Sequence, residues 1–239
     1  MKALLGVLLF SFLSSACTKT QNMSEIDPPA NPTSTSGKEK SYLALGDSYT
    51  IGEAVKPVES FPLQLQNLLK AEGVNVSTPK IIATTGWTTD ELKNAIVQAK
   101  ITQKFDFVSL LIGVNNQYRG YPLSTYKKEF SELLQTAIAF ANGDKTKVFV
   151  ISIPDWGVTP FGRSAGKSSQ SIAKEIDDFN AANQEITLSA GVSYSNITPA
   201  SRNALTDLSL IASDGLHPSA KMYGEWANTL LPKVSAVYK

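Results

Sequence analysis

Short apolar segments alternate with longer amphipathic segments from Ser41 onward, and this alternation restricts the fold more than any other feature. The short segments predict strands at residues 42–46, 80–84, 107–113, 147–153 and 192–195. The amphipathic segments predict helices at residues 61–71, 89–101, 123–141, 168–190 and 219–237. Strands and helices in alternation form a mostly parallel sheet with helices on both faces. We therefore expect an α/β fold, a three-layer α/β/α sandwich with a central sheet of about five strands.

The chain divides into parts of different composition. Residues 41–239 carry the alternating pattern, and a 239-residue chain with 42% hydrophobic residues is long enough to build one sizeable core. Residues 18–40 are polar, contain three prolines and show no apolar period. Such a segment is typical of a disordered tether. We expect one domain at residues 41–239, joined to this tether.

Residues 1–17 have the pattern of an export signal. One lysine precedes an apolar run at residues 3–13, and small residues at 14–16 stand directly before Cys17. The run is too short to span a bilayer and ends in a small-residue cleavage site, which predicts a secretory signal peptide. A lone cysteine at this place resembles the lipobox of bacterial lipoproteins, in which the cysteine is acylated, although Ser14 stands where lipoboxes usually have leucine.

The lipobox resemblance implies an exported protein of the bacterial cell envelope, in the periplasm or at the cell surface. Acyl chains on Cys17 would then provide its only contact with the membrane. The alternative is ordinary secretion with cleavage near Ala16.

The charges and the rare residues of the chain restrict its partners. Lysine and arginine number 22 against 21 acidic residues, so the sequence gives no electrostatic footprint for nucleic acid. One histidine and one cysteine do not supply the ligand cluster of a structural or catalytic zinc site. We expect no nucleic-acid partner, no metal and no cofactor. The sequence does not indicate an oligomeric state.

A serine, a histidine and an aspartate lie in positions that suit nucleophilic catalysis. A serine hydroxyl attacks an ester only beside a base whose pKa lies near the working pH. His217 is the only histidine, so an imidazole base would have to be this residue. Asp214 lies three residues before it, close enough on a short turn to hold one ring nitrogen. Ser48 directly follows the first predicted strand region, in the segment GDSY.

Four segments of the chain resemble the conserved blocks of the GDSL/SGNH hydrolases, in the order of that family. They are LGDSYTIG at 45–52 (block I), TGW at 85–87 (block II), IGVNN at 112–116 (block III) and SDGLHPS at 213–219 (block V). The resemblance implies an SGNH/flavodoxin-like fold. Two positions depart from the family pattern: Tyr49 replaces the leucine of the family name, and Asn116 replaces an aspartate.

The resemblance also assigns roles to residues. It implies Ser48 as nucleophile, with Asp214 and His217 as the other members of a catalytic triad. It further implies an oxyanion hole made by the backbone N–H groups of Ser48 and Gly86 and by the side chain of Asn115. All three oxyanion residues follow predicted strands, where open α/β sheets bind their ligands.

Aromatic residues gather at the predicted strand ends, and two interpretations of them are equally open. They either cap the core or line a pocket for the acyl or alcohol group of a substrate. On the second interpretation, the candidates for substrate contact are Trp87, Tyr118 and Trp156, together with Asn116.

We therefore expect a serine esterase that hydrolyses carboxylic esters through an acyl-enzyme on Ser48. Its substrate would be a small-molecule or carbohydrate ester, with O-acyl groups such as acetyl on carbohydrates favoured by the predicted export and the tryptophans. Two alternatives stay open. One is lysophospholipase or thioesterase activity, and the other is a non-catalytic surface lipoprotein that binds glycans or a protein on an SGNH scaffold. Acyl transfer in place of hydrolysis is also open.

Overall fold

The structure of the protein is a computed structural model that describes residues 37–238. The predicted signal peptide, the candidate lipidation site Cys17 and most of the predicted tether lie outside the described residues.

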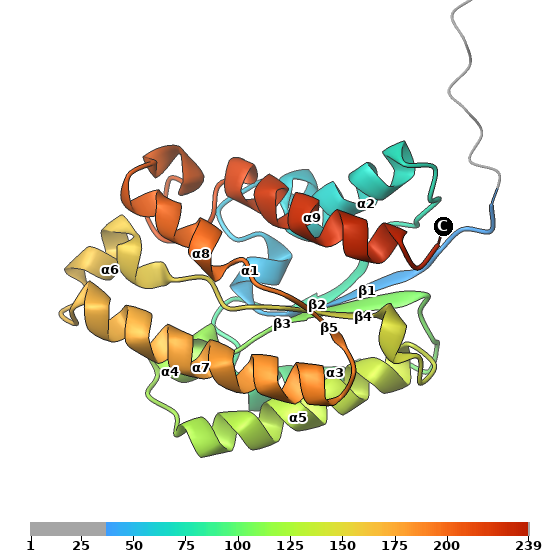
Figure 1. Cartoon of the computed structure of the whole chain (residues 1–239), viewed down its shortest axis with the longest axis horizontal. Helices are drawn as coiled ribbons and strands as arrows, with labels where there is room; N and C mark the ends of the chain where they lie inside the picture. Colours follow the sequence, from blue (N-terminus) through green and yellow to red (C-terminus); the bar gives the residue numbers. More distant parts are fainter. Residues whose placement is uncertain (1–36, 239) are drawn as a thin grey trace, which may run out of the picture. The chain divides into compact units, whose positions relative to one another are not determined.

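Five parallel strands form one sheet, as the sequence predicts (Figure 1). Their order across the sheet is β2-β1-β3-β4-β5. The strands are β1 (Tyr42–Gly46), β2 (Lys80–Ala83), β3 (Phe107–Leu111), β4 (Val148–Ile151) and β5 (Ser193–Ser195). All residues of β1, β3 and β4 are buried, because central strands of a parallel sheet are covered on both faces. The edge strands β2 and β5 are more exposed.

Helices cover both faces of the sheet, which confirms the three-layer prediction. Figure 1 shows α2 and α9 on one face and α3, α5 and α7 on the other. The long helices are α2 (Phe61–Ala71), α3 (Thr89–Gln98), α5 (Leu123–Phe140), α7 (Ser169–Ser189) and α9 (Ala220–Ser235). Short helices are α1 (Ser48–Ile51), α4 (Val114–Tyr118), α6 (Pro160–Ser164) and α8 (Thr198–Ser201). Turns of 3₁₀-helix are η1 (Pro57–Glu59), η2 (Lys145–Lys147), η3 (Trp156–Val158), η4 (Arg202–Leu205) and η5 (Leu208–Leu210).

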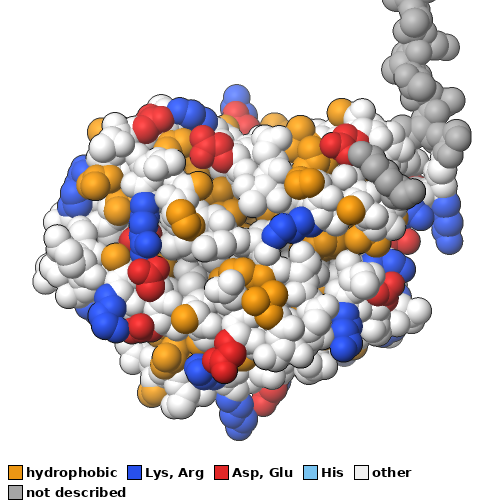
Figure 2. All heavy atoms as spheres, viewed as in Figure 1, with side chains coloured by type: hydrophobic (Ala, Val, Ile, Leu, Met, Phe, Trp, Pro, Cys, Tyr) orange, Lys and Arg blue, Asp and Glu red, His pale blue; other side chains and the backbone are white. Residues whose placement is uncertain are grey.

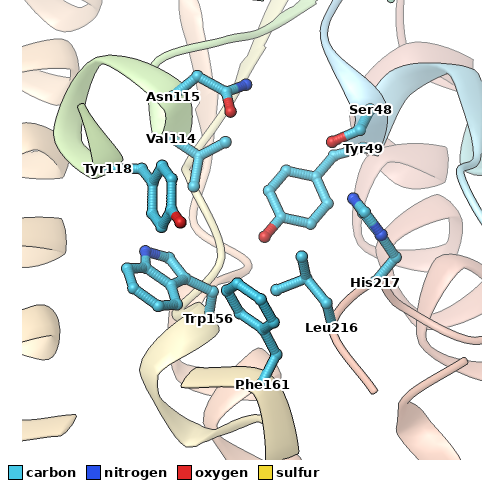
Figure 3. Close-up of a pocket in the computed structure, with 9 residues that line it drawn as sticks. All are labelled: Ser48, Tyr49, Val114, Asn115, Tyr118, Trp156, Phe161, Leu216 and His217. Carbon is cyan, nitrogen blue, oxygen red and sulfur yellow. The ribbon is translucent and has the colours of Figure 1, made fainter. Parts of the chain in front are cut away.

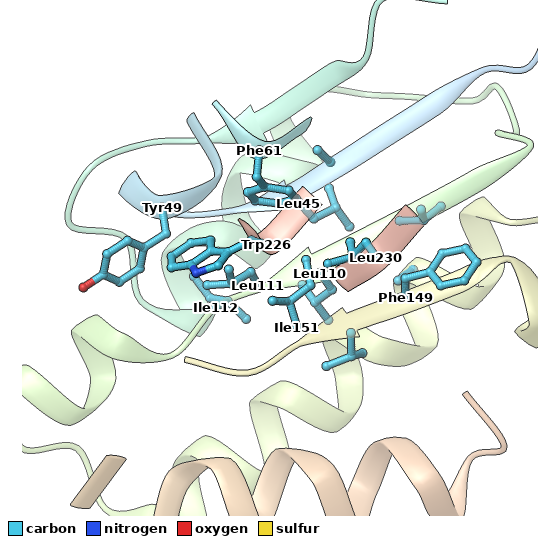
Figure 4. Close-up of a cluster of buried hydrophobic side chains, with 14 of the residues drawn as sticks. Leu45, Tyr49, Phe61, Leu110, Leu111, Ile112, Phe149, Ile151, Trp226 and Leu230 are labelled. Carbon is cyan, nitrogen blue, oxygen red and sulfur yellow. The ribbon is translucent and has the colours of Figure 1, made fainter. Parts of the chain in front are cut away.

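The core between the sheet and the α2/α9 layer is built from large apolar side chains (Figure 4). Phe61 of α2 and Trp226 of α9 pack against each other, with ring centroids 6.4 Å apart. Both are fully buried, together with Leu45 and Leu110 of the central strands. Each such side chain stabilises the fold by about 1.5–3 kcal/mol relative to exposure.

Three strands, β2, β3 and β4, end one or two residues earlier than the sequence predicts. Just beyond the end of β4 at Ile151, the backbone of Ile153 bonds to a side chain of α7 and not to a neighbouring strand. Its N–H donates to Asn180 Oδ1 at 2.8 Å, and its carbonyl accepts from Asn180 Nδ2 at 2.9 Å. The chain therefore leaves the sheet at this point, although its residues stay apolar.

The sheet order places a ligand site at the carboxyl ends of β1 and β3. In an open parallel sheet, a crevice forms where the strand order reverses, and here β2 and β3 flank β1. The register pairs Gly46 with Leu111, so both strands end at the same level. Residues that follow these two strands therefore meet at one edge.

The surface mixes both signs of charge. Figure 2 shows lysine and arginine side chains interspersed with aspartate and glutamate on the face in view. Within residues 37–238, none of the helices combines the length and the apolar character needed to cross a membrane.

Candidate active site

The segment that carries Ser48 turns sharply from β1 into the short helix α1. A Cβ at Gly46 would lie 2.0 Å from Thr50 Oγ1, so only glycine permits this close return of the chain. Asp47 caps the helix, and its side chain accepts the N–H of Tyr49 at 3.1 Å. Ser48 is the first residue of α1, and its N–H has no partner within the helix. The turn therefore presents both the hydroxyl and the N–H of Ser48 at the strand end.

Asp47 supports this turn from inside the protein. Its carboxyl group is fully buried, and burial raises its pKa to about 7, with a smaller opposing effect from the N–H of Tyr49. In the described part of the chain, Oδ2 has no hydrogen-bond partner. The carboxyl group does not line the pocket beside Ser48, so its role is structural.

Asp214 and His217 belong to one closed loop. An antiparallel bridge joins Ile211 to Pro218, and Asp214 Oδ1 accepts the N–H groups of Leu216 and His217, each at 3.0 Å. Asp214 Oδ2 lies 2.6 Å from Nδ1 of His217. Burial raises the pKa of Asp214, but the hydrogen bonds from the ring and from the two N–H groups outweigh it and hold the pKa below its ordinary value. The carboxylate is thus ionised at neutral pH and fixes the ring.

The histidine ring and the serine hydroxyl share one pocket. Figure 3 shows Ser48 and His217 on the same side of it. Because Asp214 engages Nδ1, Nε2 is the nitrogen left for the serine. Tyr49 packs edge-on against the ring, with centroids 5.8 Å apart and an interplanar angle of 64°. Ser48 is 4% exposed and His217 8%, so only small parts of both residues reach the pocket surface.

The predicted oxyanion residues lie close together, but they differ in exposure to the pocket. Asn115 lines it from α4, and one N–H of its amide donates to the carbonyl of Trp87 at 3.0 Å. The second N–H is then available to a ligand. Gly86 is not among the lining residues; it precedes Trp87 in a turn and has a φ of +86°. Ser48 and Asn115 therefore face the pocket, and Gly86 adjoins it.

Two of the four residues considered for substrate contact lie elsewhere. Asn116 is fully buried and does not line the pocket. Its Oδ1 accepts the N–H of Thr89 at 3.1 Å, and its Nδ2 donates to the Thr89 hydroxyl at 2.7 Å, so it joins α4 to the start of α3. Trp87 packs against the core at the edge of the turn and also does not line the pocket. Asn116 and Trp87 therefore belong to the structure around the pocket and not to its lining.

The other two, Tyr118 and Trp156, form an aromatic wall of the pocket together with Phe161. Figure 3 shows this wall across the pocket from His217. The ring centroids of Tyr118 and Phe161 lie 5.4 and 6.2 Å from that of Trp156. Trp156 is buried and donates its indole N–H to Gln117 Oε1 at 2.8 Å, whereas Tyr118 is 56% and Phe161 39% exposed.

Four lining residues are not among those predicted from the sequence, namely Tyr49, Val114, Phe161 and Leu216. Except for Phe161, each is the immediate neighbour of a predicted site residue, so proximity in sequence is the available signal.

The segment at 162–168, which has a glycine spacing close to that of a phosphate-binding loop, begins inside α6. Its Lys167 bonds to Glu175 at 2.6 Å. The described residues include no group of three or more His, Cys, Asp or Glu side chains placed for a metal ion.

A parallel α/β sheet with a serine, a histidine–aspartate pair and an amide donor in one pocket at its switch point defines the class of SGNH-type ester hydrolases. The GDSL-like lipase/acylhydrolase family matches residues 44–224. The chain belongs to this family, and it is a carboxylic ester hydrolase.

Solved structures with the same fold include several ester hydrolases. The lipase/acylhydrolase from Enterococcus faecalis has a TM-score of 0.64 at 21% identity, over 83% of this chain and 96% of that protein. The acetylxylan esterase Axe2 from Geobacillus stearothermophilus has a TM-score of 0.63 at 19% identity, over 82% and 94%. TesA has a TM-score of 0.63 at 15% identity, over 83% and 99%. No curated protein matches the sequence.

Proposed function

We propose that the protein hydrolyses esters through an acyl-enzyme on Ser48, with His217 as general base and Asp214 as the group that orients it. The observation that carries the proposal is the 2.6 Å contact between Asp214 Oδ2 and His217 Nδ1 in a loop whose ring shares the pocket with Ser48. Nε2 takes the proton of the hydroxyl while Oγ bonds to the carbonyl carbon. The same proton then passes to the leaving alcohol.

Water completes the reaction by the same route in reverse. Nε2 removes a proton from water as its oxygen attacks the acyl carbon, and Ser48 leaves with that proton as the free acid forms. In both steps, negative charge develops on the carbonyl oxygen. The N–H groups of Ser48 and Gly86 and the second amide N–H of Asn115 are proposed to receive it, and one such donor contributes roughly 3 kcal/mol.

For the substrate, we propose short O-acyl groups, such as acetyl, on carbohydrates. The pocket volume is about 180 Å³, below the range of roughly 300–1,000 Å³ for pockets that hold drug-sized ligands. Its lining residues include no lysine, arginine, aspartate or glutamate, which suits a neutral substrate. The exposed faces of Tyr118 and Phe161 offer flat surfaces on which a sugar ring could stack. A solved structure of similar fold belongs to an acetylxylan esterase.

We also propose that the protein is exported and anchored to the bacterial envelope through lipid on Cys17. The support is the apolar run at residues 3–13 and the small residues before this single cysteine. Radioactive palmitate should label the wild-type protein in cells and not the Cys17→Ser variant. Equal labelling of both would refute the anchor.

The function is tested with p-nitrophenyl acetate, butyrate and octanoate and with an acetylated xylo-oligosaccharide. Wild type should prefer acetate, and Ser48→Ala should lose all turnover. Ser189→Ala, which removes an exposed hydroxyl at the end of α7, is the matched control and should keep full activity. Preference for octanoate would favour lysophospholipase or thioesterase activity. A folded wild type without turnover on any ester would refute the proposal.

A further inference from the structure

The turn at residues 84–87 is held by side chains from other segments of the chain. The hydroxyl of Thr85 donates to the carboxylate of Glu53, which lies just after the nucleophile helix α1. The carbonyl of Trp87 accepts from the amide of Asn115 on α4. Two residues of this turn, Thr85 and Trp87, are therefore bonded to the other two segments that supply the proposed oxyanion donors.

Arg119 supplies a third bond, to the residue between these two. It is the C-terminal cap of α4, and its terminal nitrogens have separate partners. Nη2 donates to the carbonyl of Gly86 at 2.6 Å, and Nη1 donates to Glu91 at 3.2 Å. The other oxygen of Glu91 accepts the N–H of Thr88 at 2.8 Å, in the capping box of α3. The planar guanidinium thus joins the end of α4 to the turn and to the start of α3.

Gly86 is the residue of this turn whose backbone rotates most freely. It has no side chain, and its φ of +86° is one that other residues rarely adopt. Rotation of the peptide group between Thr85 and Gly86 would turn the N–H of Gly86 away from the pocket. The charge-assisted hydrogen bond from Arg119 to the Gly86 carbonyl opposes this rotation. It fixes the peptide group between Gly86 and Trp87, which limits the rotation about Gly86.

We propose that Arg119 is a positioning residue of the oxyanion hole, which holds Gly86 so that its N–H points at the carbonyl oxygen of the substrate. The inference rests on the proposed function, in which this N–H is an oxyanion donor. Arg119 does not line the pocket, so it acts through Gly86 and not on the substrate. Oxyanion donors lower the barrier because they are oriented before the reaction. A loosened donor therefore lowers kcat and leaves KM nearly unchanged.

A surface ion pair alone would have little effect. The side chains of Arg119 and Glu91 are 41% and 40% exposed, and pairs of such exposure stabilise a fold only slightly. Lys93 and Glu132 form a comparable pair between α3 and α5, with exposures of 50% and 39%, and that pair has no bond to the turn. Lys93→Ala is therefore a matched control, which removes a surface pair and leaves the turn intact.

The experiment compares kcat and KM of the full-length wild type with those of Arg119→Ala, Arg119→Lys and Lys93→Ala on p-nitrophenyl acetate. Arg119→Ala should lower kcat roughly 10- to 100-fold with KM within about twofold, the loss expected for a catalytic group displaced by ~1 Å. Arg119→Lys should recover part of the loss, because its ammonium group reaches the Gly86 carbonyl. It lacks the two rigidly spaced nitrogens with which arginine bonds Gly86 and Glu91 at the same time. Added guanidinium ion should raise the kcat of Arg119→Ala and not that of Lys93→Ala.

Amide hydrogen exchange gives a readout that does not depend on turnover. The N–H of Trp87 closes the turn on the carbonyl of Thr84, and it should exchange faster in Arg119→Ala than in wild type or Lys93→Ala. Unchanged exchange, unchanged kcat or a loss confined to KM would overturn the proposal. If wild type is inactive, the proposed function fails, and exchange alone shows whether Arg119 holds the turn.

Discussion

Replacement of Asp47 by asparagine should make the protein more stable at neutral pH. The carboxyl group is fully buried beside Ser48, one of its oxygens has no partner in the described part of the chain, and burial raises its pKa to about 7. Asparagine is also a good helix N-cap and keeps the acceptor for the N–H of Tyr49. The variant therefore removes an ionisable group with little change in shape.

The size of the effect follows from the difference between the folded and unfolded pKa of this group. The unfolded value is 3.8 and the folded value is about 7. Because the folded pKa is the higher one, the carboxyl favours the folded state below pH 3.8, and this contribution is lost as the pH rises to 7. One pKa unit corresponds to about 1.4 kcal/mol, so the loss amounts to about 4 kcal/mol.

Urea unfolding of both proteins at several pH values between 4 and 8 measures this change. The free energy of unfolding of wild type minus that of Asp47→Asn should fall by about 4 kcal/mol over this range. Asp207 is the control carboxylate: it is exposed, and Lys221 lowers its pKa to about 2. The corresponding difference for Asp207→Asn should be constant between pH 5 and 8 and change only in more acid solution. A constant difference for Asp47→Asn would refute the reasoning, since it would mean that the buried carboxyl ionises near its ordinary pKa.

Three other variants test the site. Asp214→Asn keeps an acceptor for the backbone N–H groups but presents an NH₂ group to Nδ1 of His217. In steady-state kinetics, kcat should therefore fall roughly 10³- to 10⁴-fold, and near-normal turnover would contradict the triad. Asn115→Ala removes a proposed oxyanion donor and should lower kcat ~100-fold or more while KM changes little, and a change in KM alone would argue against this role. Asn116→Ala leaves the N–H of Thr89 unpaired in a buried place, although the Thr89 hydroxyl keeps its bond to Glu129. The loss should cost about 1–3 kcal/mol in urea unfolding, and an unchanged unfolding midpoint would contradict that contact.

The sequence predicted long elements well and short ones poorly. Strands β1, β3 and β4 were recognisable because central strands of a parallel sheet are apolar at nearly every position. The helices α1, α4, α6 and α8 have four or five residues each, too few to show a helical period. The predicted end of β4 is too late because bonds between the backbone of Ile153 and the side chain of Asn180, far along the chain, decide it.

The chemistry of the candidate site is largely contained in local sequence. A spacing of three residues suffices for Asp214 to bond both the backbone and the ring of His217, because a turn of this length closes by itself. The positions after two neighbouring strands determine that Ser48 and Asn115 meet, since the carboxyl ends of parallel strands lie at one edge.

Tertiary structure decided which neighbours of the motifs face the substrate and which support the site. Trp156 reaches the pocket and Asn116 does not, although both follow predicted strands. The bond from Arg119 to Gly86 joins residues 33 positions apart, and nothing in either local sequence distinguishes this arginine from an ordinary surface charge. Local residue types thus determine which groups could react. Which side chains are buried, and which hydrogen-bond partners they have, depends on contacts that exist only once distant segments pack together.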